Sequence, residues 1–323
     1  FKQKTAYEIR NCDWSSDVCS SDLEANFSIG SNGDLYVNCG YPTNEFLALR
    51  ADGNRHWAHS YNEFEFPILT EAAVQNNGDI VYVAAGLCED ANYACTSGKL
   101  VSSDSSGAIQ WEQRIDVEFP SSPSIGQDGT IYVGTLVKNT SPEQSRGRLY
   151  AFNADGRLKW NVKTQGSLLA PAIAEDGTIF LAGQYLAEDS DMETELRLTN
   201  AKDATGLLYA FHPEGELRWS RKTDYALIAV PAIGPNGAVH VMTRKRLLVL
   251  NPGDGSMNWD YRVDNENWPT QKHWSTAENP RELVGLVQNV SPAISKDGIV
   301  YAPNSFVRSE EHTSELQSQF RIS

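Results

Sequence analysis

SPSIGQDGTIYVG (Ser122–Gly134), followed after a variable stretch by GRLYAFNADGRLKW (Gly147–Trp160), is the unit that builds the middle of this 323-residue chain. The first half of the unit recurs, closely or in divergent form, from Asn26, Glu71, Ala170, Val230 and Ser291. Repetition at intervals of roughly 40–60 residues indicates stacked units that bury a core only together.

Two features hold in every copy. Each first half has Asn-Gly or Asp-Gly between two apolar runs, at Gly33, Gly78, Gly129, Gly177, Gly237 and Gly298. Each second half has a Gly four residues before a Trp, in the pairs Gly53/Trp57, Gly107/Trp111, Gly156/Trp160, Gly215/Trp219 and Gly255/Trp259. Asn-Gly and Asp-Gly suit tight hairpin turns in which both central residues adopt positive φ.

Each unit therefore predicts four antiparallel strands, because its runs are rich in Val, Ile, Tyr and Phe. We expect an all-β protein, a β-propeller of four-stranded blades with five complete repeats and part of a sixth. The alternative, a parallel β-helix, needs a shorter and more uniform period. The five repeat tryptophans are expected to be structural, each packed between neighbouring blades: Trp57, Trp111, Trp160, Trp219 and Trp259.

The copies APAIAEDGTIFLAG, from Ala170, and LLYAFHPEGELRW, ending at Trp219, resemble the repeat of pyrroloquinoline-quinone (PQQ) type β-propellers. That superfamily includes quinoprotein alcohol dehydrogenases and an outer-membrane-protein assembly lipoprotein. The resemblance covers residues 24–307. It implies a closed disc of about seven or eight blades, so we expect this chain to be a fragment, an incomplete propeller.

The two ends do not resemble the repeat. DNA that encodes RSEEHTSELQS (Arg308–Ser318) has a reverse complement that encodes DWSSDVCSSDL (Asp13–Leu23), and that DNA resembles a sequencing-library adaptor. We therefore expect residues 1–23 and 308–323 to be adaptor-derived and 24–307 to be the propeller, and we exclude the ends from functional argument. A natural polar tail and a short capped helix are the alternatives.

Charge and hydropathy limit the partners. The formal net charge is −15, which argues against nucleic acid and anionic lipid, since both require basic patches. No apolar run is long enough for a transmembrane helix. Three cysteines lie between the two excluded ends: Cys39, Cys88 and Cys95.

Strand alternation places the turns after the first and third strands on one face and all connections of variable length on the other, which is the expected binding face. Its candidate ligand-binding residues are Tyr61, Phe64, Phe66, Trp268, His273 and Trp274. The partner is expected to be a protein or a carbohydrate; packing of the long loops onto the disc is the alternative for the two tryptophans.

Cys88 and Cys95 share one of these loops and predict a local disulfide, with Cys39 left as a thiol. The alternatives are free thiols or half of a metal site. A disulfide implies a periplasmic or extracellular location. An acidic loop contains Glu188, Asp189, Asp191, Glu193 and Glu195; it is interpreted as solvated, with calcium binding as the alternative. The histidines His56, His59, His212 and His240 are isolated beside strands and turns, which favours structural roles.

The sequence supports a binding module more than an enzyme. The resemblance implies, for the dehydrogenases, a vicinal cysteine pair against the PQQ cofactor, with calcium ligands and an Asp base; here no two cysteines are adjacent. We assign no catalytic, cofactor-binding or metal-binding residue, and neither PQQ nor calcium is supported. The prediction is a non-catalytic, exported scaffold. The alternatives are a fragment of a PQQ-dependent dehydrogenase and an extracytoplasmic sensor domain.

Overall fold

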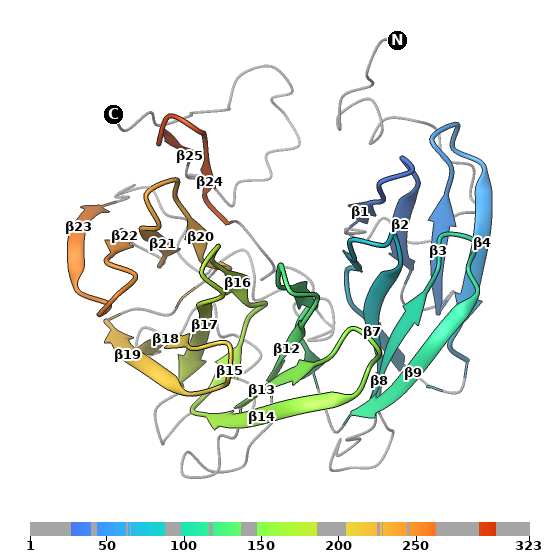
Figure 1. The fold of residues 1–323 in the computed structure, drawn as a ribbon, viewed down its shortest axis with the longest axis horizontal. Coiled ribbons are helices and arrows are strands. Elements are labelled where there is room, and N and C mark those ends of the chain that lie inside the picture. Colours follow the sequence, from blue (N-terminus) through green and yellow to red (C-terminus); the bar gives the residue numbers. More distant parts are fainter. Residues whose placement is uncertain are drawn as a thin grey trace, which may run out of the picture.

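The computed structural model describes residues 27–39, 44–62, 64, 66–87, 98–115, 119–136, 147–185, 205–224, 227, 229–243, 246–262 and 291–301. Within those residues all regular secondary structure is β-strand. The strands form five complete antiparallel sheets and one two-stranded sheet. Figure 1 shows the sheets following one another as blades around a common centre. The prediction of a β-propeller with five complete repeats and part of a sixth is confirmed.

Each blade runs from an inner to an outer strand. Blade 1 is β1 (Phe27–Ile29), β2 (Leu35–Cys39), β3 (Glu45–Leu49) and β4 (Arg55–Ser60). Blade 2 is β5 (Phe66–Leu69), β6 (Ala73–Val74), β7 (Ile80–Leu87), β8 (Gly98–Ser103) and β9 (Ile109–Ile115). Blade 3 is β10 (Phe119–Pro120), β11 (Ser124–Ile125), β12 (Ile131–Leu136), β13 (Gly147–Phe152) and β14 (Leu158–Thr164).

The later blades repeat this order. Blade 4 is β15 (Ser167–Leu168), β16 (Ala172–Ile173), β17 (Ile179–Tyr185), β18 (Thr205–Phe211) and β19 (Leu217–Thr223). Blade 5 is β20 (Ala232–Ile233), β21 (Val239–Met242), β22 (Arg246–Leu250) and β23 (Met257–Arg262), and blade 6 begins with β24 (Ala293–Ile294) and β25 (Val300–Tyr301). In blades 2 to 4 the innermost strand is split into two short pieces that both pair with the second strand.

The innermost strands contact one another from blade to blade. β6 contacts β1 and β11, β16 contacts β11 and β20, and β20 contacts β24. Two of these steps carry a hydrogen bond from a serine hydroxyl to a carbonyl of the next blade, Ser28 Oγ to Ala72 O and Ser124 Oγ to Pro171 O, both at 2.6 Å. These contacts and hydrogen bonds join successive blades at the centre of the disc.

The hairpin turns differ from the expected type. In the first turn the Gly33 N–H donates to Gly30 O at 2.9 Å, and the Gly30 N–H donates to Asp34 O at 2.8 Å. Gly33 has a φ of 84°, whereas the only non-glycine residue with positive φ among those described is Asn44. The turns therefore have one left-handed residue, the glycine that follows the turn and forms a bulge, and not two.

The Asn or Asp before the glycine was expected to adopt positive φ, but it instead supplies a hydrogen-bond acceptor. Its side chain accepts the N–H of the residue after the glycine, as in Asn32 Oδ1 with the Asp34 N–H at 3.0 Å and Asp176 Oδ1 with the Thr178 N–H at 2.9 Å. This local bond satisfies a backbone donor that the bulge leaves unpaired. The pattern is thus fixed by a side-chain acceptor followed by a residue free to adopt positive φ.

Four of the five repeat tryptophans pack against the next blade. Each of the first four donates its indole N–H to the second residue of the outer turn in the next blade: Trp57 to Ser105 O, Trp111 to Ala154 O, Trp160 to Pro213 O and Trp219 to Pro252 O, at 2.9–3.1 Å. The glycine of that turn lies flat against the ring, and a Cβ at Gly156 would be 2.5 Å from Trp111 Cε3. Only a glycine fits there, which explains why Gly and Trp recur together.

Candidate functional site

The two faces of the disc are built differently. The connections after the first and third strands of a blade are the short turns described above, and they lie together on what we call the turn face. The connections after the second and fourth strands run from 2 residues, between β14 and β15, to 30 residues, between β23 and β24. They emerge on the opposite face, which we call the long-loop face, and nearly all variation in length is on that side.

Tyr61 and Phe64, two of the predicted ligand-binding residues, lie at the junction of blades 1 and 2. Tyr61 is 3% exposed, which corrects the expectation that it is displayed on the surface. Phe64 packs against the same cluster and stacks on Tyr61, with ring centroids 6.4 Å apart. Phe64 also covers Gly86, where a Cβ would be 2.4 Å from its ring. Both aromatic rings therefore serve the core, because the chain after β4 folds back against blade 2.

A chain of hydrogen bonds runs from Tyr61 to the outer turn of blade 2. Its hydroxyl lies 2.6 Å from the Tyr82 hydroxyl, which lies 2.7 Å from His59 Nδ1, and His59 Nε2 lies 2.8 Å from Gly107 O. Since a carbonyl only accepts, the neutral ring of His59 places its proton on Nε2 and accepts from Tyr82 through Nδ1. Burial raises the pKa of Tyr82 far above its ordinary value. The chain is enclosed and links the blades, and it fits the structural role expected for His59.

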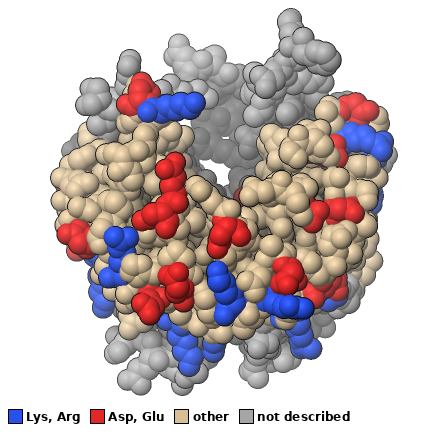
Figure 2. Space-filling model, in the orientation of Figure 1, with Lys and Arg blue, Asp and Glu red and all other residues tan. Residues whose placement is uncertain are grey.

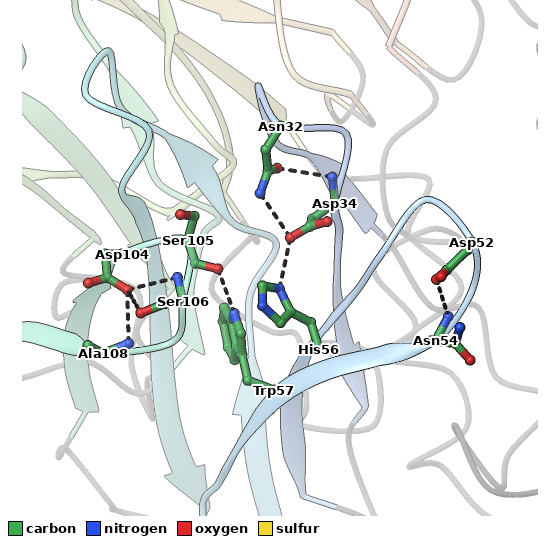
Figure 3. Close-up of polar contacts among 10 residues, drawn as sticks. All are labelled: Asn32, Asp34, Asp52, Asn54, His56, Trp57, Asp104, Ser105, Ser106 and Ala108. Atoms are coloured by element: carbon green, nitrogen blue, oxygen red, sulfur yellow. Dashed lines mark hydrogen bonds and ion pairs between the residues drawn. The ribbon is translucent and has the colours of Figure 1, made fainter.

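The turn face carries carboxylates that serve the turns. Asp34 Oδ2 accepts from Asn32 Nδ2 at 2.9 Å and from His56 Nδ1 at 3.0 Å, which ties β4 to the first turn (Figure 3). Hydrogen bonds from Ser106 hold the pKa of Asp104 below its ordinary value. Among the described residues no three His, Cys, Asp or Glu side chains gather as metal ligands would. These carboxylates are explained by hairpin geometry.

Cys39 corrects the expected cysteine pattern. It is disulfide-bonded and therefore not a free thiol, and all four other cysteines lie outside the described residues. Cys39 is 4% exposed and packs with Val37, Leu47 and Leu49 on the side of blade 1 that faces away from blade 2. The predicted Cys88–Cys95 disulfide stays a prediction, and it excludes either of these cysteines as the partner of Cys39.

Several of the predicted functional residues lie outside the described part of the chain. Trp268, His273, Trp274 and the acidic loop lie outside the described residues, as do the two end segments. For Phe66 only the backbone is described, and it pairs with Leu87. No helix among the described residues is long and apolar enough to cross a membrane.

Comparison with known proteins identifies the repeat. The profile of the PQQ_2 family, described as outer membrane protein assembly factor BamB, matches residues 43–202, just under half of the chain. The chain is a PQQ-like β-propeller repeat protein. No curated protein matches it significantly. The match spans blade 1 from β3, all of blades 2 and 3 and the first half of blade 4.

Solved structures share the fold of this PQQ-like propeller. BamB from Moraxella catarrhalis is similar with a TM-score of 0.51 and 13% identity, over 86% of this chain and 66% of that one. The Dos1 propeller is similar with a TM-score of 0.52 and 13% identity, over 75% of this chain and 59% of that one. At these identities the likeness shows the fold alone, and this chain is shorter than either.

Proposed function

We propose that this chain is a non-catalytic scaffold that holds a protein partner on its long-loop face. The observation that carries the proposal is the division of the disc: the described turns on one face are all short and differ in length by one residue at most, whereas the connections on the other face run from 2 to 30 residues. Loops presented by a rigid β-scaffold are the usual place for recognition. Tight interlocking of Trp and Gly between blades supplies that rigidity.

The described residues do not fit PQQ and calcium. Two of the histidines named in the sequence analysis are occupied within the fold: both nitrogens of His59 have partners, and His56 is bound to Asp34. No described cluster offers three metal ligands, and the sequence has no adjacent cysteines. We therefore derive no redox step for this chain. Adding PQQ and calcium is expected to leave its absorbance and melting temperature unchanged; a saturable shift would favour the dehydrogenase alternative.

A protein is the partner class we favour over a carbohydrate. The matching family is described as an outer membrane protein assembly factor, a task that consists of contacts between proteins. The strong negative charge of the chain also disfavours nucleic acid and anionic membranes. We extend the proposal to an exported location, periplasmic or extracellular, as the family description suggests.

The proposed export rests on the predicted Cys88–Cys95 disulfide, because disulfides persist in oxidising compartments. The test uses the chain without residues 1–23, which removes Cys12 and Cys19, produced once in an oxidising compartment and once in the cytoplasm. Thiols are counted after denaturation. We expect one free thiol among Cys39, Cys88 and Cys95 in the exported protein; three free thiols would remove this argument for export.

Site-specific photo-crosslinking tests the binding face. A benzoylphenylalanine is placed at Ser60 or Asp224, which are exposed at the long-loop face, and at Asp52 or Asp155 on the turn face. Crosslinking is carried out in cells of the source organism and adducts are identified by mass spectrometry. We expect one recurrent protein adduct from the long-loop positions and none from the turn positions. Equal adducts from both faces, or none from either, would contradict the proposal.

A further inference from the structure

The described residues form an open arc with blade 6 at one end (Figure 1, Figure 2). Beside that end blade 5 displays two aromatic rings, because Trp259 and Tyr261 of β23 are each 39% exposed. Their partners across the strand pair, Val249 and Leu247, are buried in the cluster that blade 5 forms with blade 6. Side chains opposite each other in an antiparallel pair share one face of the sheet, so both rings face blade 6. The outer half of this face is therefore incompletely covered.

The inner half of the same face is covered by the two strands of blade 6. Val300 of β25 is 2% exposed, and Ile294 of β24 packs against the same cluster. In the complete blades the second strand pairs with strands on both of its edges, whereas β25 pairs only with β24 among the described residues. The other edge of β25 is the place where a third strand of the blade pairs, because an edge strand can accept a further strand through its backbone groups.

The interior interfaces show which structure covers such a face. Between blades 3 and 4 the hairpin of β18 and β19 covers Trp160: a Cβ at Gly215 would be 2.9 Å from its Cδ2, and Pro213 O accepts the indole N–H at 2.9 Å. The alternate residues Tyr209 and Phe211 of β18 pack in the same cluster as residues of blade 3. The outer face of a blade is thus covered by a β-hairpin with an apolar first strand and a glycine in its turn.

A second copy of this chain does not offer such a hairpin without breaking a blade. Four of its outer turns already have their glycine against a tryptophan ring, and the turn of Gly53 in blade 1 is the uncovered one among the described residues. That turn joins β3 to β4, and β3 pairs with β2 from Leu47 to Phe46 and beyond, along its whole length. The edge of β3 that β25 needs is therefore occupied, which favours a hairpin from a different polypeptide.

We propose that the outer half of blade 6 is formed in trans by a β-hairpin of a partner protein. The first strand of that hairpin pairs with β25 and places alternate apolar side chains against blade 5. Its turn carries a glycine that lies on the ring of Trp259, and a turn carbonyl accepts the indole N–H. This surface is the end of the arc and not the long-loop face, so the inference is independent of the proposed function.

A preformed hairpin tests the inference without the partner. The peptide has the sequence of Gly206–Thr223, whose two end residues pair in blade 4. Its ends are joined by a D-Pro-Gly turn, because an isolated hairpin is only marginally stable. Isothermal titration calorimetry with the purified chain should show saturable binding, and hydrogen exchange at Val300 and Tyr301 should slow when the peptide is bound. A cyclic peptide with the same residues in scrambled order should do neither. Absence of saturable binding, or unchanged exchange in β25, would overturn the inference.

Two substitutions on β23 separate the proposed face from the opposite one. Trp259→Ala removes the ring that the turn covers and should weaken peptide binding at least about tenfold. Met257→Ala removes a side chain that is 40% exposed but pairs with Leu250, which packs towards blade 4, and should change binding less than about twofold. Circular dichroism checks the fold of both variants. Equal losses would contradict the proposal, as would a dimer of the chain alone that Trp259→Ala dissociates in sedimentation, since the occupant is then a second copy.

Discussion

Blades 4 and 5 contain the same tryptophan in the same motif, yet only one of them is enclosed. Trp219 lies against Gly255 of blade 5, where a Cβ would be 2.7 Å from its Cε3, and donates to Pro252 O at 2.9 Å. Trp259 is 39% exposed, and no glycine turn among the described residues lies against it. The motif therefore supplies half of an interface in each blade, and the next blade must supply the other half.

The other end of the arc gives the complementary case. The turn of blade 1 has its glycine, Gly53, with φ of 86°, but no atom lies within 4 Å of the position of a Cβ there. An interior turn such as that of Gly215 has the same backbone and a Trp160 ring 2.9 Å away. The energy of a blade thus depends on its neighbours, as expected of a repeat protein whose stability sums nearest-neighbour interfaces.

The largest effect is expected from the two tryptophans. Trp219→Ala should lower the free energy of unfolding by about 3 kcal/mol or more, since it removes a ring packed on Phe180 and a hydrogen bond to the next blade. Trp259→Ala should cost under about 1 kcal/mol, because its ring is already partly solvated. Urea unfolding followed by circular dichroism measures both. Equal losses would show that the motif acts within its own blade.

Two glycine substitutions test the same comparison, with a smaller expected change in the free energy of unfolding. Gly53→Ala should cost about 1–2 kcal/mol, the strain of a left-handed alanine. Gly215→Ala adds the clash with Trp160 and should cost a further 1–3 kcal/mol or so. Both are measured by the same urea unfolding. If the two substitutions cost the same, the ring contact at Gly215 contributes nothing and turn strain alone explains the glycine.

The sequence was sufficient for the architecture because the determining residues act locally. Asn or Asp before Gly makes the turn after the first strand of each blade, and Gly with Trp makes each interface, so counting copies predicted five complete blades and part of a sixth. The predicted turn type was wrong, because the preference of Asn-Gly and Asp-Gly for tight turns does not distinguish a turn with one left-handed residue from a turn with two. Only the register, with its shift between Ala151 and Phe152 in blade 3, reveals the bulge.

The candidate site was less accessible to sequence reasoning because it depends on contacts between blades. Tyr61 follows a strand in a polar stretch, which indicates a surface position, but its hydroxyl meets Tyr82 in the next blade.

The smallest expected effect concerns the residue beneath each tryptophan. Phe180 lies under Trp219 in blade 4, and His240 holds the same place under Trp259, with centroids 6.3 Å apart. His240 is 5% exposed and its Nδ1 lies 3.1 Å from Ala238 O, so Nδ1 carries a proton. Burial lowers the pKa of His240, because the charged imidazole loses its hydration. Blade 5 is therefore expected to be acid-sensitive where blade 4 is not.

The sign of that sensitivity follows from linkage. A base whose pKa is lower in the folded chain than in the unfolded chain lets the unfolded state bind more protons, so stability falls as pH drops below about 6.5. His240→Phe, which copies blade 4, should be more favourable at pH 5.5 than at pH 8 by up to about 1 kcal/mol. Urea unfolding at both pH values measures the difference, with Phe180→Leu as a control that should be independent of pH. If His240→Phe has the same effect at both pH values, His240 is already hydrated through the exposed side of Trp259, and the end blade is more open than its burial indicates.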